Sequence, residues 1–310
     1  MIQTFGLVKQ YKNLTAVDHL DLMIPEGDIF GFIGPNGAGK TTTIKMLSTL
    51  TKPTSGRATV AGFDILEQPD DVKRVIGYMP DSFGVYEDMK VWEYLDFFAA
   101  AYRIPRDKRP TIIDDVLNLT DLIYKKDDYV EALSKGMKQR LCLAKTLVHD
   151  PKVLLLDEPA SGLDPRARIE LRELLKELQR MGKTILVSSH ILKELAEFCT
   201  SIGIVERGKL LASGSVESIV QGMAGGGGAT VIVQVKDGAD RARDLLAANP
   251  AVAGVETDGA TLRVKLAEQG ADSSFIAETL FGAGLKVVSI KEEEMDLEAM
   301  FMRITTGAVQ

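Results

Sequence analysis

Short apolar runs alternate with amphipathic segments through residues 1–224. Residues 29–33, 153–156 and 184–187 are almost wholly apolar, as parallel strands are when both of their faces are buried. Helix-like segments lie between these runs. The alternation predicts an α/β domain built around a mostly parallel sheet.

The clearest helix is predicted after the second of these runs. Asp164-Pro165 is a typical helix start, with an N-cap residue followed by proline at the first helical position. Gly182 supplies a stop. Leucines occupy one helical face in between, at 171, 174, 175 and 178.

Residues 83–130 have a different pattern. They contain no strand-like run, and Val91, Tyr94, Leu95 and Phe98 follow helical spacing. We therefore expect a helical insertion within the α/β domain.

Four glycines at Gly225–Gly228 mark a flexible linker, because neither a helix nor a strand interior favours glycine. Residues 225–310 then show their own order of strand, helix, strand, strand, helix and strand. The predicted segments are 230–236, 239–248, 253–257, 261–266, 273–281 and 286–290. This βαββαβ pattern predicts a small α+β, ferredoxin-like domain.

Composition is typical of a globular protein in the cytosol. The 310 residues carry a net charge of −7, which argues against nucleic acid as a partner. Cys142 and Cys199 lie in apolar patterns and are expected to be free thiols. We also expect no signal peptide and no membrane span, because no apolar run reaches the ~18 residues that a spanning helix needs.

A glycine-rich phosphate loop follows the first apolar run and precedes a helical pattern at 41–50. Its sequence fits G-x-x-x-x-G-K-[ST], in which converging backbone amides hold phosphates, Lys40 reaches the β and γ phosphates, and Thr41 offers a hydroxyl to Mg²⁺. The predicted ATP-contacting residues here are Gly34, Pro35, Asn36, Gly37, Ala38, Gly39, Lys40, Thr41 and Thr42.

Two adjacent carboxylates end the run at 153–156. Ligands collect at this end of strands in open α/β sheets, and buried charge there is costly unless a cation or a reaction needs it. We expect Asp157 to hold Mg²⁺ and Glu158 to activate the attacking water. Together with the phosphate loop, this pair predicts a P-loop ATPase.

Residues 1–220 resemble the ATP-binding subunits of ABC transporters. Leu133-Ser134-Lys135-Gly136-Met137 is similar to the family's signature loop, usually LSGGQ. The resemblance implies that Ser134 and Gly136 bind the γ-phosphate held by a second copy, so that two copies form a homodimer with ATP between them. Lys135 and Met137 depart from the usual sequence.

Other family positions are matched less closely. The resemblance implies that His190 contacts the γ-phosphate during catalysis, that Tyr11 stacks on adenine, and that residues 161–164 pass information between two nucleotide sites. Asp81 stands where the family usually has glutamine, and as an oxygen donor it is expected to approach Mg²⁺. The tail at 294–302 resembles the final helix of multidrug and ABC-2-type exporter ATPases.

The leading hypothesis is an ATP hydrolase that energises a separate transmembrane permease, favoured as an exporter, from the cytoplasmic face of the cell membrane. Its expected domains are an ATP-binding domain at 1–224, with a helical part near 83–130, and an accessory domain at 225–310. One alternative is a soluble ABC ATPase of DNA repair, chromosome structure or translation, although such proteins usually carry coiled-coil arms, zinc-binding cysteines or fused halves. Another is a P-loop kinase or GTPase, which leaves the signature loop and His190 unexplained.

Overall fold

The computed structural model describes the chain except for residues 83, 217, 220–229, 268–271 and 293–310. The described residues form two compact units, one comprising residues 1–216 and one lying within residues 218–292. The glycine run at 225–228 and the tail at 294–302 lie outside the described residues. Among those described, no helix has both the length and the apolar character to span a membrane.

A six-stranded sheet forms the centre of the first unit, in the order β10-β9-β3-β8-β7-β6. Neighbouring strands run parallel from β9 to β6, and only β10 is antiparallel to its neighbour. Every residue of β3, β7 and β8 is buried, which explains why β3, β7 and the centre of β8 carry almost no polar side chains. The strands are β3 (Ile29–Ile33), β6 (Ile76–Met79), β7 (Val153–Leu156), β8 (Thr184–Ser189), β9 (Ser201–Glu206) and β10 (Lys209–Ser215).

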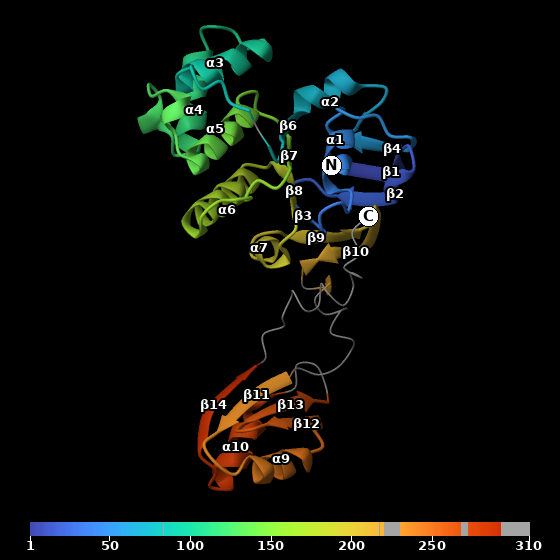
Figure 1. Ribbon diagram of the computed structural model, residues 1–310, viewed down its shortest axis with the longest axis vertical. Helices are drawn as coiled ribbons and strands as arrows, with labels where there is room; N and C mark the ends of the chain where they lie inside the picture. Colours follow the sequence, from blue (N-terminus) through green and yellow to red (C-terminus); the bar gives the residue numbers. More distant parts are fainter. Residues whose placement is uncertain (83, 217, 220–229, 268–271, 293–310) are drawn as a thin grey trace. The chain divides into compact units, whose positions relative to one another are not determined.

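Helices lie on both sides of this sheet. Figure 1 shows α1 on one side and α5 and α6 on the other. The predicted start of α6 is confirmed, because the Asp164 carboxylate accepts a hydrogen bond of 3.0 Å from the Ala167 backbone N–H and Pro165 is the first helical residue. The helices are α1 (Lys40–Leu47), α2 (Pro69–Val75), α5 (Lys135–Leu147), α6 (Pro165–Arg180) and α7 (Leu192–Ala196).

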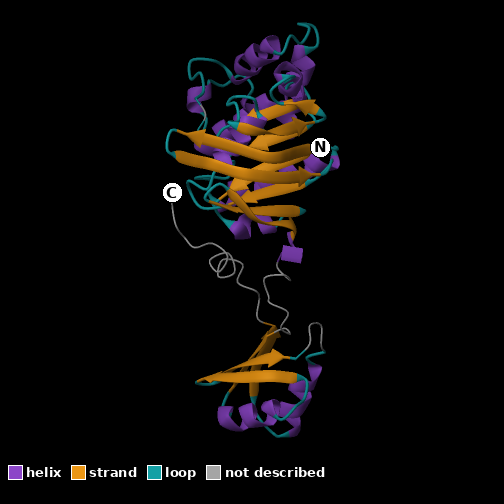
Figure 2. Ribbon diagram, turned by 90° about the vertical axis from the view of Figure 1, so that its right-hand side faces the viewer, coloured by secondary structure: helices purple, strands orange, loops and turns teal. Residues whose placement is uncertain are grey.

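A second sheet in this unit is antiparallel, with the order β2-β1-β4-β5. Apolar residues of its long strands, such as Leu7 and Leu20, share one core with Phe32 of β3 and Ile44 of α1. In Figure 2 the strands of the first unit lie together in front of several of its helices. The strands are β1 (Ile2–Tyr11), β2 (Leu14–Ile24), β4 (Ser55–Val60) and β5 (Phe63–Asp64).

The region predicted to be a helical insertion contains α3 (Val91–Ala101), α4 (Arg109–Leu119) and the 3₁₀ turns η1 (Ile123–Lys125) and η2 (Val130–Ala132). Tyr94 and Leu95 are fully buried on α3, as their spacing predicts. A single bridge between Lys90 and Tyr129 is the only strand-type pairing in its described part.

The second unit has a four-stranded antiparallel sheet in the order β12-β13-β11-β14, with two helices. This strand order and the βαββαβ succession confirm the ferredoxin-like prediction. Alternate residues such as Val233 and Val264 are buried against Leu246 and Ile276 of the helices. The elements are β11 (Thr230–Val235), α9 (Ala239–Ala247), β12 (Val252–Asp258), β13 (Thr261–Leu266), α10 (Ser274–Gly282) and β14 (Val287–Glu292).

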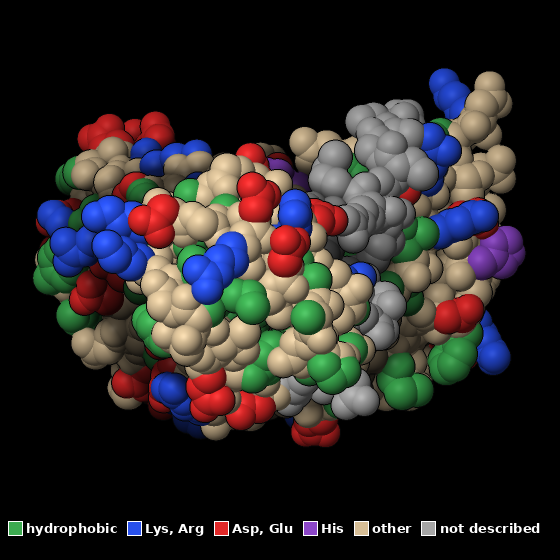
Figure 3. Space-filling model, turned by 90° about the horizontal axis from the view of Figure 1, so that it is seen from below, with side chains coloured by type: hydrophobic (Ala, Val, Ile, Leu, Met, Phe, Trp, Pro, Cys, Tyr) green, Lys and Arg blue, Asp and Glu red, His purple; other side chains and the backbone are tan. Residues whose placement is uncertain are grey.

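Charges of both signs lie beside one another on the face of the molecule drawn in Figure 3. Arg243 of α9, for example, is paired with both Asp240 and Asp244.

Candidate active site

The phosphate loop turns sharply between β3 and α1. Gly39 has a φ of +100°, and a side chain on it would clash with the Ala16 carbonyl oxygen of β2. A side chain on Gly34 would meet the Val205 carbonyl oxygen in the same way. No side chain caps α1, so the amides of its first turn remain available to an anion.

Lys40 lies at the centre of the site. Its side chain is only 6% exposed, and its Nζ donates hydrogen bonds of 2.6 Å to the Gly34 carbonyl and 3.2 Å to the Pro35 carbonyl. The same Nζ is 3.3 Å from Glu158 Oε1. The ammonium group is therefore held between the phosphate loop and the carboxylate predicted to activate water.

Asp157 follows β7 and is buried. Its Oδ1 accepts a hydrogen bond of 2.7 Å from Ser188 Oγ, whereas its Oδ2 is buried and has no hydrogen-bond partner among the described residues. Burial raises the pKa of this carboxyl, against the opposing effect of hydrogen bonds from Ser188 and Thr41. The described residues thus compensate ionised Asp157 only in part.

The residues at this point fit Mg²⁺. A buried, unpartnered carboxylate oxygen next to the Thr41 hydroxyl is a donor set suited to a hard cation. No group of three or more His, Cys, Asp or Glu side chains forms a cage for a metal in the part of the chain that the structure describes. Mg²⁺ would therefore take its remaining ligands from phosphate and water, as it commonly does in nucleotide sites.

Glu158 adopts a left-handed backbone conformation, with φ at +48°, which is unusual for a residue with a side chain. Its Oε2 lies 3.0 Å from His190 Nδ1, and its Oε1 faces Lys40. The carboxylate is 14% exposed and the imidazole 46%. Lys40, Glu158 and His190 form a connected row that opens to solvent at the histidine.

Ser188 is a further member of this site, and it was not among the residues predicted from the sequence. It is fully buried, and its hydroxyl both donates to Asp157 Oδ1 and accepts from the Glu158 backbone N–H at 2.9 Å. A signal was present, because two serines end the otherwise apolar run of β8 beside the acidic end of β7. A buried hydroxyl there needs a partner.

Asp81 lies just after β6 and is exposed. It is close enough to Asp157 to contribute, behind burial, to the raised pKa of that carboxyl. Together with burial and Asp157, it also raises the pKa of the Tyr78 hydroxyl to about 12. Asp81 is therefore on the same side of the sheet edge as the Mg²⁺ candidates.

Other predicted contacts do not meet the phosphate loop of their own chain. Ser134 is the N-cap of α5, is exposed, and accepts a hydrogen bond of 3.3 Å from the Met137 N–H. Gly136 lies in the first turn of that helix. Figure 1 places α5 across the sheet from α1.

Tyr11, at the end of β1, is 44% exposed. The Lys9 Nζ lies 4.8 Å from the centre of its ring. Tyr11 is on the hairpin that continues into Ala16, the residue packed over Gly39. Its ring is thus presented to solvent on the β1–β2 side of the phosphate loop.

A strand, a glycine loop with its lysine and a helix, together with two carboxylates at the end of a nearby parallel strand, define a P-loop ATPase. Comparison with known proteins narrows this class. The family model described as "ABC transporter" matches residues 17–161. The chain belongs to the ABC transporter family of ATP-binding proteins.

Relatives and solved structures agree with this assignment. The linearmycin resistance ATP-binding protein LnrL of Bacillus subtilis is 30% identical over 98% of both chains. The bacitracin transport ATP-binding protein BcrA of Bacillus licheniformis is 41% identical over 68% of both. A dimeric ATP-binding cassette, MJ0796, solved with ADP and Pi in a post-hydrolysis state, matches 70% of this chain and 99% of its own with a TM-score of 0.64 and 25% identity.

Other curated relatives are longer. The chain spans 64% of a relative from Synechocystis sp. and 38% of one from Escherichia coli. The alternative of a DNA-repair or translation ATPase finds no support in the relatives named above.

Proposed function

We propose that this chain is the ATP-hydrolysing subunit of an ABC exporter and acts on a separate membrane permease. The observation that carries the hydrolytic part is the row from Lys40 through Glu158 to His190, with contacts of 3.3 and 3.0 Å. Support for export comes from LnrL and BcrA, whose names specify antibiotic resistance and transport. The subunit would lie at the cytoplasmic face of the membrane that holds the permease.

Each of Lys40, Glu158 and His190 has a role in the proposed hydrolysis of ATP. The amides of the phosphate loop and Lys40 hold the β and γ phosphates, and a water placed beside Glu158 attacks the γ-phosphorus. Its proton passes to the Glu158 carboxylate as the bond to the β–γ bridging oxygen breaks, which yields ADP and phosphate. His190 orients Glu158 and contacts the γ-phosphate.

Metal-binding residues complete the proposal. Thr41 and Asp157 would hold Mg²⁺, with Asp81 acting directly or through water, because Thr41 and Asp81 both lie near the Asp157 carboxyl, whose Oδ2 has no partner among the described residues. When bound, the ion would offset the negative charge of the phosphates. Tyr11 would stack on adenine from the exposed end of its hairpin.

ATP would also join two copies of the chain. Ser134 and Gly136 lie at an exposed helix N-terminus, which is a favourable place for a phosphate. Since this helix start is across the sheet from the phosphate loop of the same chain, a second copy is the natural source of that phosphate. The dimeric ABC cassette among the similar structures supports this arrangement.

We propose a separate function for each of the segments defined from the sequence. We assign residues 1–224 to ATP binding and hydrolysis, the helical part near 83–130 and the Asp81 loop to coupling with the permease, and residues 225–310 to an accessory role. The mixed and net acidic surface favours protein partners over nucleic acid.

Replacing Glu158 with Gln tests the hydrolytic assignment. The amide fills the same space but is too weak a base to take a proton from water, so we expect ATP to bind and turnover to fall by at least ~10²-fold. A dimer should then persist in ATP on gel filtration. Glu177→Gln, an exposed change on α6, is the matched control. Near-normal hydrolysis by Glu158→Gln would reject Glu158 as the base.

A further inference from the structure

The loop that follows Glu158 is folded back on this catalytic residue. The Ser161 N–H donates a hydrogen bond of 3.0 Å to the Glu158 carbonyl oxygen, and the Leu163 N–H donates one of 3.2 Å to the Ala160 carbonyl oxygen. Two consecutive turns therefore join Glu158 to the start of α6. The segment 161–164, which is expected to pass information between two nucleotide sites, belongs to this connection.

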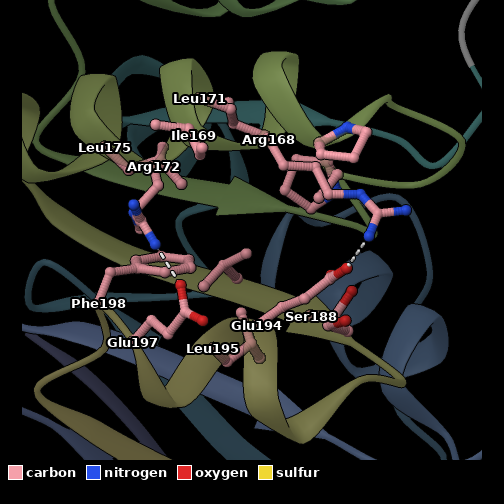
Figure 4. A pocket seen from close by; sticks show the side chains of 15 residues that line it. Arg168, Ile169, Leu171, Arg172, Leu175, Ser188, Glu194, Leu195, Glu197 and Phe198 are labelled. Carbon is pink, nitrogen blue, oxygen red and sulfur yellow. Dashed lines mark hydrogen bonds and ion pairs between the residues drawn. The ribbon is translucent and has the colours of Figure 1, made fainter.

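Arg168, in the first turn of α6, joins this loop to α7. Its Nε donates a hydrogen bond of 3.0 Å to the Leu163 carbonyl oxygen, and its Nη1 donates one of 2.6 Å to Glu194 Oε1 (Figure 4). The guanidinium group is planar, and its N–H donors keep a fixed geometry. One rigid group therefore holds both acceptors at a set separation.

Glu194 lies on α7, four residues after His190. Two leucines of this helix are buried, and just before it the Ile191 N–H donates a hydrogen bond of 3.0 Å to the Ser189 hydroxyl. These contacts connect α7 to the end of β8. A displacement of Glu194 is therefore passed along a short, packed segment to His190.

The contacts around the two catalytic residues form a closed ring. One half is the loop from Glu158 to Leu163, and the other half is the chain from His190 to Glu194. The two halves meet at the 3.0 Å contact between His190 Nδ1 and Glu158 Oε2. Arg168 closes the opposite side. The spacing of the two halves is thus set at both ends.

The ion pair between Arg168 and Glu194 is expected to contribute little to the stability of the fold. The two side chains are 42% and 22% exposed, and ion pairs in contact with water stabilise proteins only weakly. A role of Arg168 in setting geometry can therefore be tested apart from a role in stability.

We propose that Arg168 is a positioning residue for ATP hydrolysis. By holding the Leu163 carbonyl and the Glu194 carboxylate together, it fixes the distance between the loop after Glu158 and the segment that carries His190. Because small displacements of catalytic groups can lower a rate greatly, loss of this link slows the chemical step without weakening ATP binding. This inference rests on the proposed ATPase function and on the roles given there to Glu158 and His190.

Arg168→Gln tests the link in the full chain. We expect kcat for ATP hydrolysis to fall about tenfold, while the KM for ATP and the melting temperature stay close to those of the parent, because the link acts on the chemical step alone. Arg168→Lys keeps the charge but lacks the planar fork, so it should lose about as much turnover. Arg180→Gln is the matched control, since it removes an exposed arginine paired with Glu177 on the same helix, and it should keep the kcat of the parent.

Glu194→Gln tests the other side of the link and should lower kcat by a similar factor. Combined with Arg168→Gln it should have no further effect, because both changes remove one contact. Unchanged kcat in either folded single variant, full activity of Arg168→Lys, or losses that add in the double variant would overturn the proposal. A joint fall in melting temperature, ATP affinity and kcat would show a structural role alone and would overturn it too. Absence of ATP hydrolysis by the parent would instead count against the proposed function.

Discussion

Ser188 connects the two acidic residues of the site through one hydroxyl. It donates to the side chain of Asp157 and accepts from the backbone of Glu158, in a fully buried position. A buried polar group that serves two partners is costly to remove, because both partners lose a bond at once. The residue therefore positions the catalytic pair without contacting phosphate itself in our proposal.

We expect Ser188→Ala to lower the free energy of unfolding by about 1–3 kcal/mol. Turnover should fall about tenfold, which corresponds to roughly 1.4 kcal/mol of lost positioning. Chemical denaturation and steady-state hydrolysis measure the two effects. Ser48→Ala removes a buried hydroxyl whose one hydrogen bond to a described residue is to the Lys45 carbonyl, so it should affect stability alone. Unchanged hydrolysis by a folded Ser188→Ala protein would contradict the positioning role.

Asp157 leads to a prediction about pH. Its pKa is raised by burial, so the folded chain holds this proton more tightly than the unfolded chain and loses stability as pH rises through the raised value. Without nucleotide, Asp157→Asn should melt at a higher temperature than the parent at pH 7, and the gap should close toward the ordinary pKa range of a carboxyl.

The same substitution should weaken Mg²⁺-dependent ATP binding, because the proposed cation ligand is lost. Thermal melts at several pH values and titration with MgATP test both statements. Asp70→Asn, at an exposed surface pair, is the control for a simple change of net charge. A lower melting temperature at pH 7 for Asp157→Asn than for the parent would show that the ionised carboxylate is compensated after all.

Two helices begin with capping side chains of different quality. The Asp164 carboxylate at the start of α6 accepts a hydrogen bond of 3.0 Å from the Ala167 N–H. At the start of α5, the exposed Ser134 hydroxyl accepts a longer hydrogen bond of 3.3 Å from the Met137 N–H. The first cap is expected to serve mainly stability. In the dimer that we propose, the second hydroxyl exchanges this weak bond for one to phosphate.

We therefore expect Asp164→Ala to destabilise the chain by about 1 kcal/mol. Ser134→Ala should destabilise the chain by only a fraction of that amount. It should nevertheless impair ATP-dependent dimerisation of a protein that also carries Glu158→Gln. Denaturation curves and gel filtration in ATP separate the two outcomes. Normal dimerisation of the Ser134→Ala protein would argue against the shared nucleotide site.

The sequence predicted best those strands whose pattern of apolar residues is not interrupted. The strands at 29–33 and 153–156 match β3 and β7 because full burial demands continuous apolar residues. The antiparallel sheet was not anticipated. Its strands β1 and β2 are interrupted by register shifts that break simple alternation.

Some residues of the site were predicted from the sequence and others were not. Lys40, Glu158 and His190 were identified from spacing and resemblance, and the fold brings their side chains together. Ser188 was missed because a serine after an apolar run has no distinctive periodicity, and its role depends on pairing between β7 and β8. Neighbouring strands reveal such a contact only after folding.

At the scale of the whole molecule, each of the two units has a hydrophobic core of its own. One includes Leu7, Phe32 and Leu155 of the first unit, and the other includes Val233 and Leu280 of the second. The proposed ATP-contacting residues all lie in the first unit. This arrangement allows either unit to change without direct loss of the other's core.

We expect a chain that ends at residue 223 to fold and to bind ATP with the affinity of the full chain, because its core and its phosphate loop are retained. Dimerisation in ATP or transport with the permease should be weaker. Circular dichroism, nucleotide titration and gel filtration provide the measurements. Loss of nucleotide binding by a folded short chain would assign residues beyond 223 to the ATP site.

The left-handed backbone at Glu158 has a consequence for laboratory evolution. Glycine adopts a positive φ without the cost that a side chain brings, which is of order 1 kcal/mol or more. Substituting glycine there would relieve this backbone strain but would also remove the carboxylate that lies 3.3 Å from Lys40 Nζ. A screen that rewards only heat tolerance or yield would not detect the loss of ATP hydrolysis that the proposed role of Glu158 predicts. A selection for stable variants should therefore also require ATP hydrolysis.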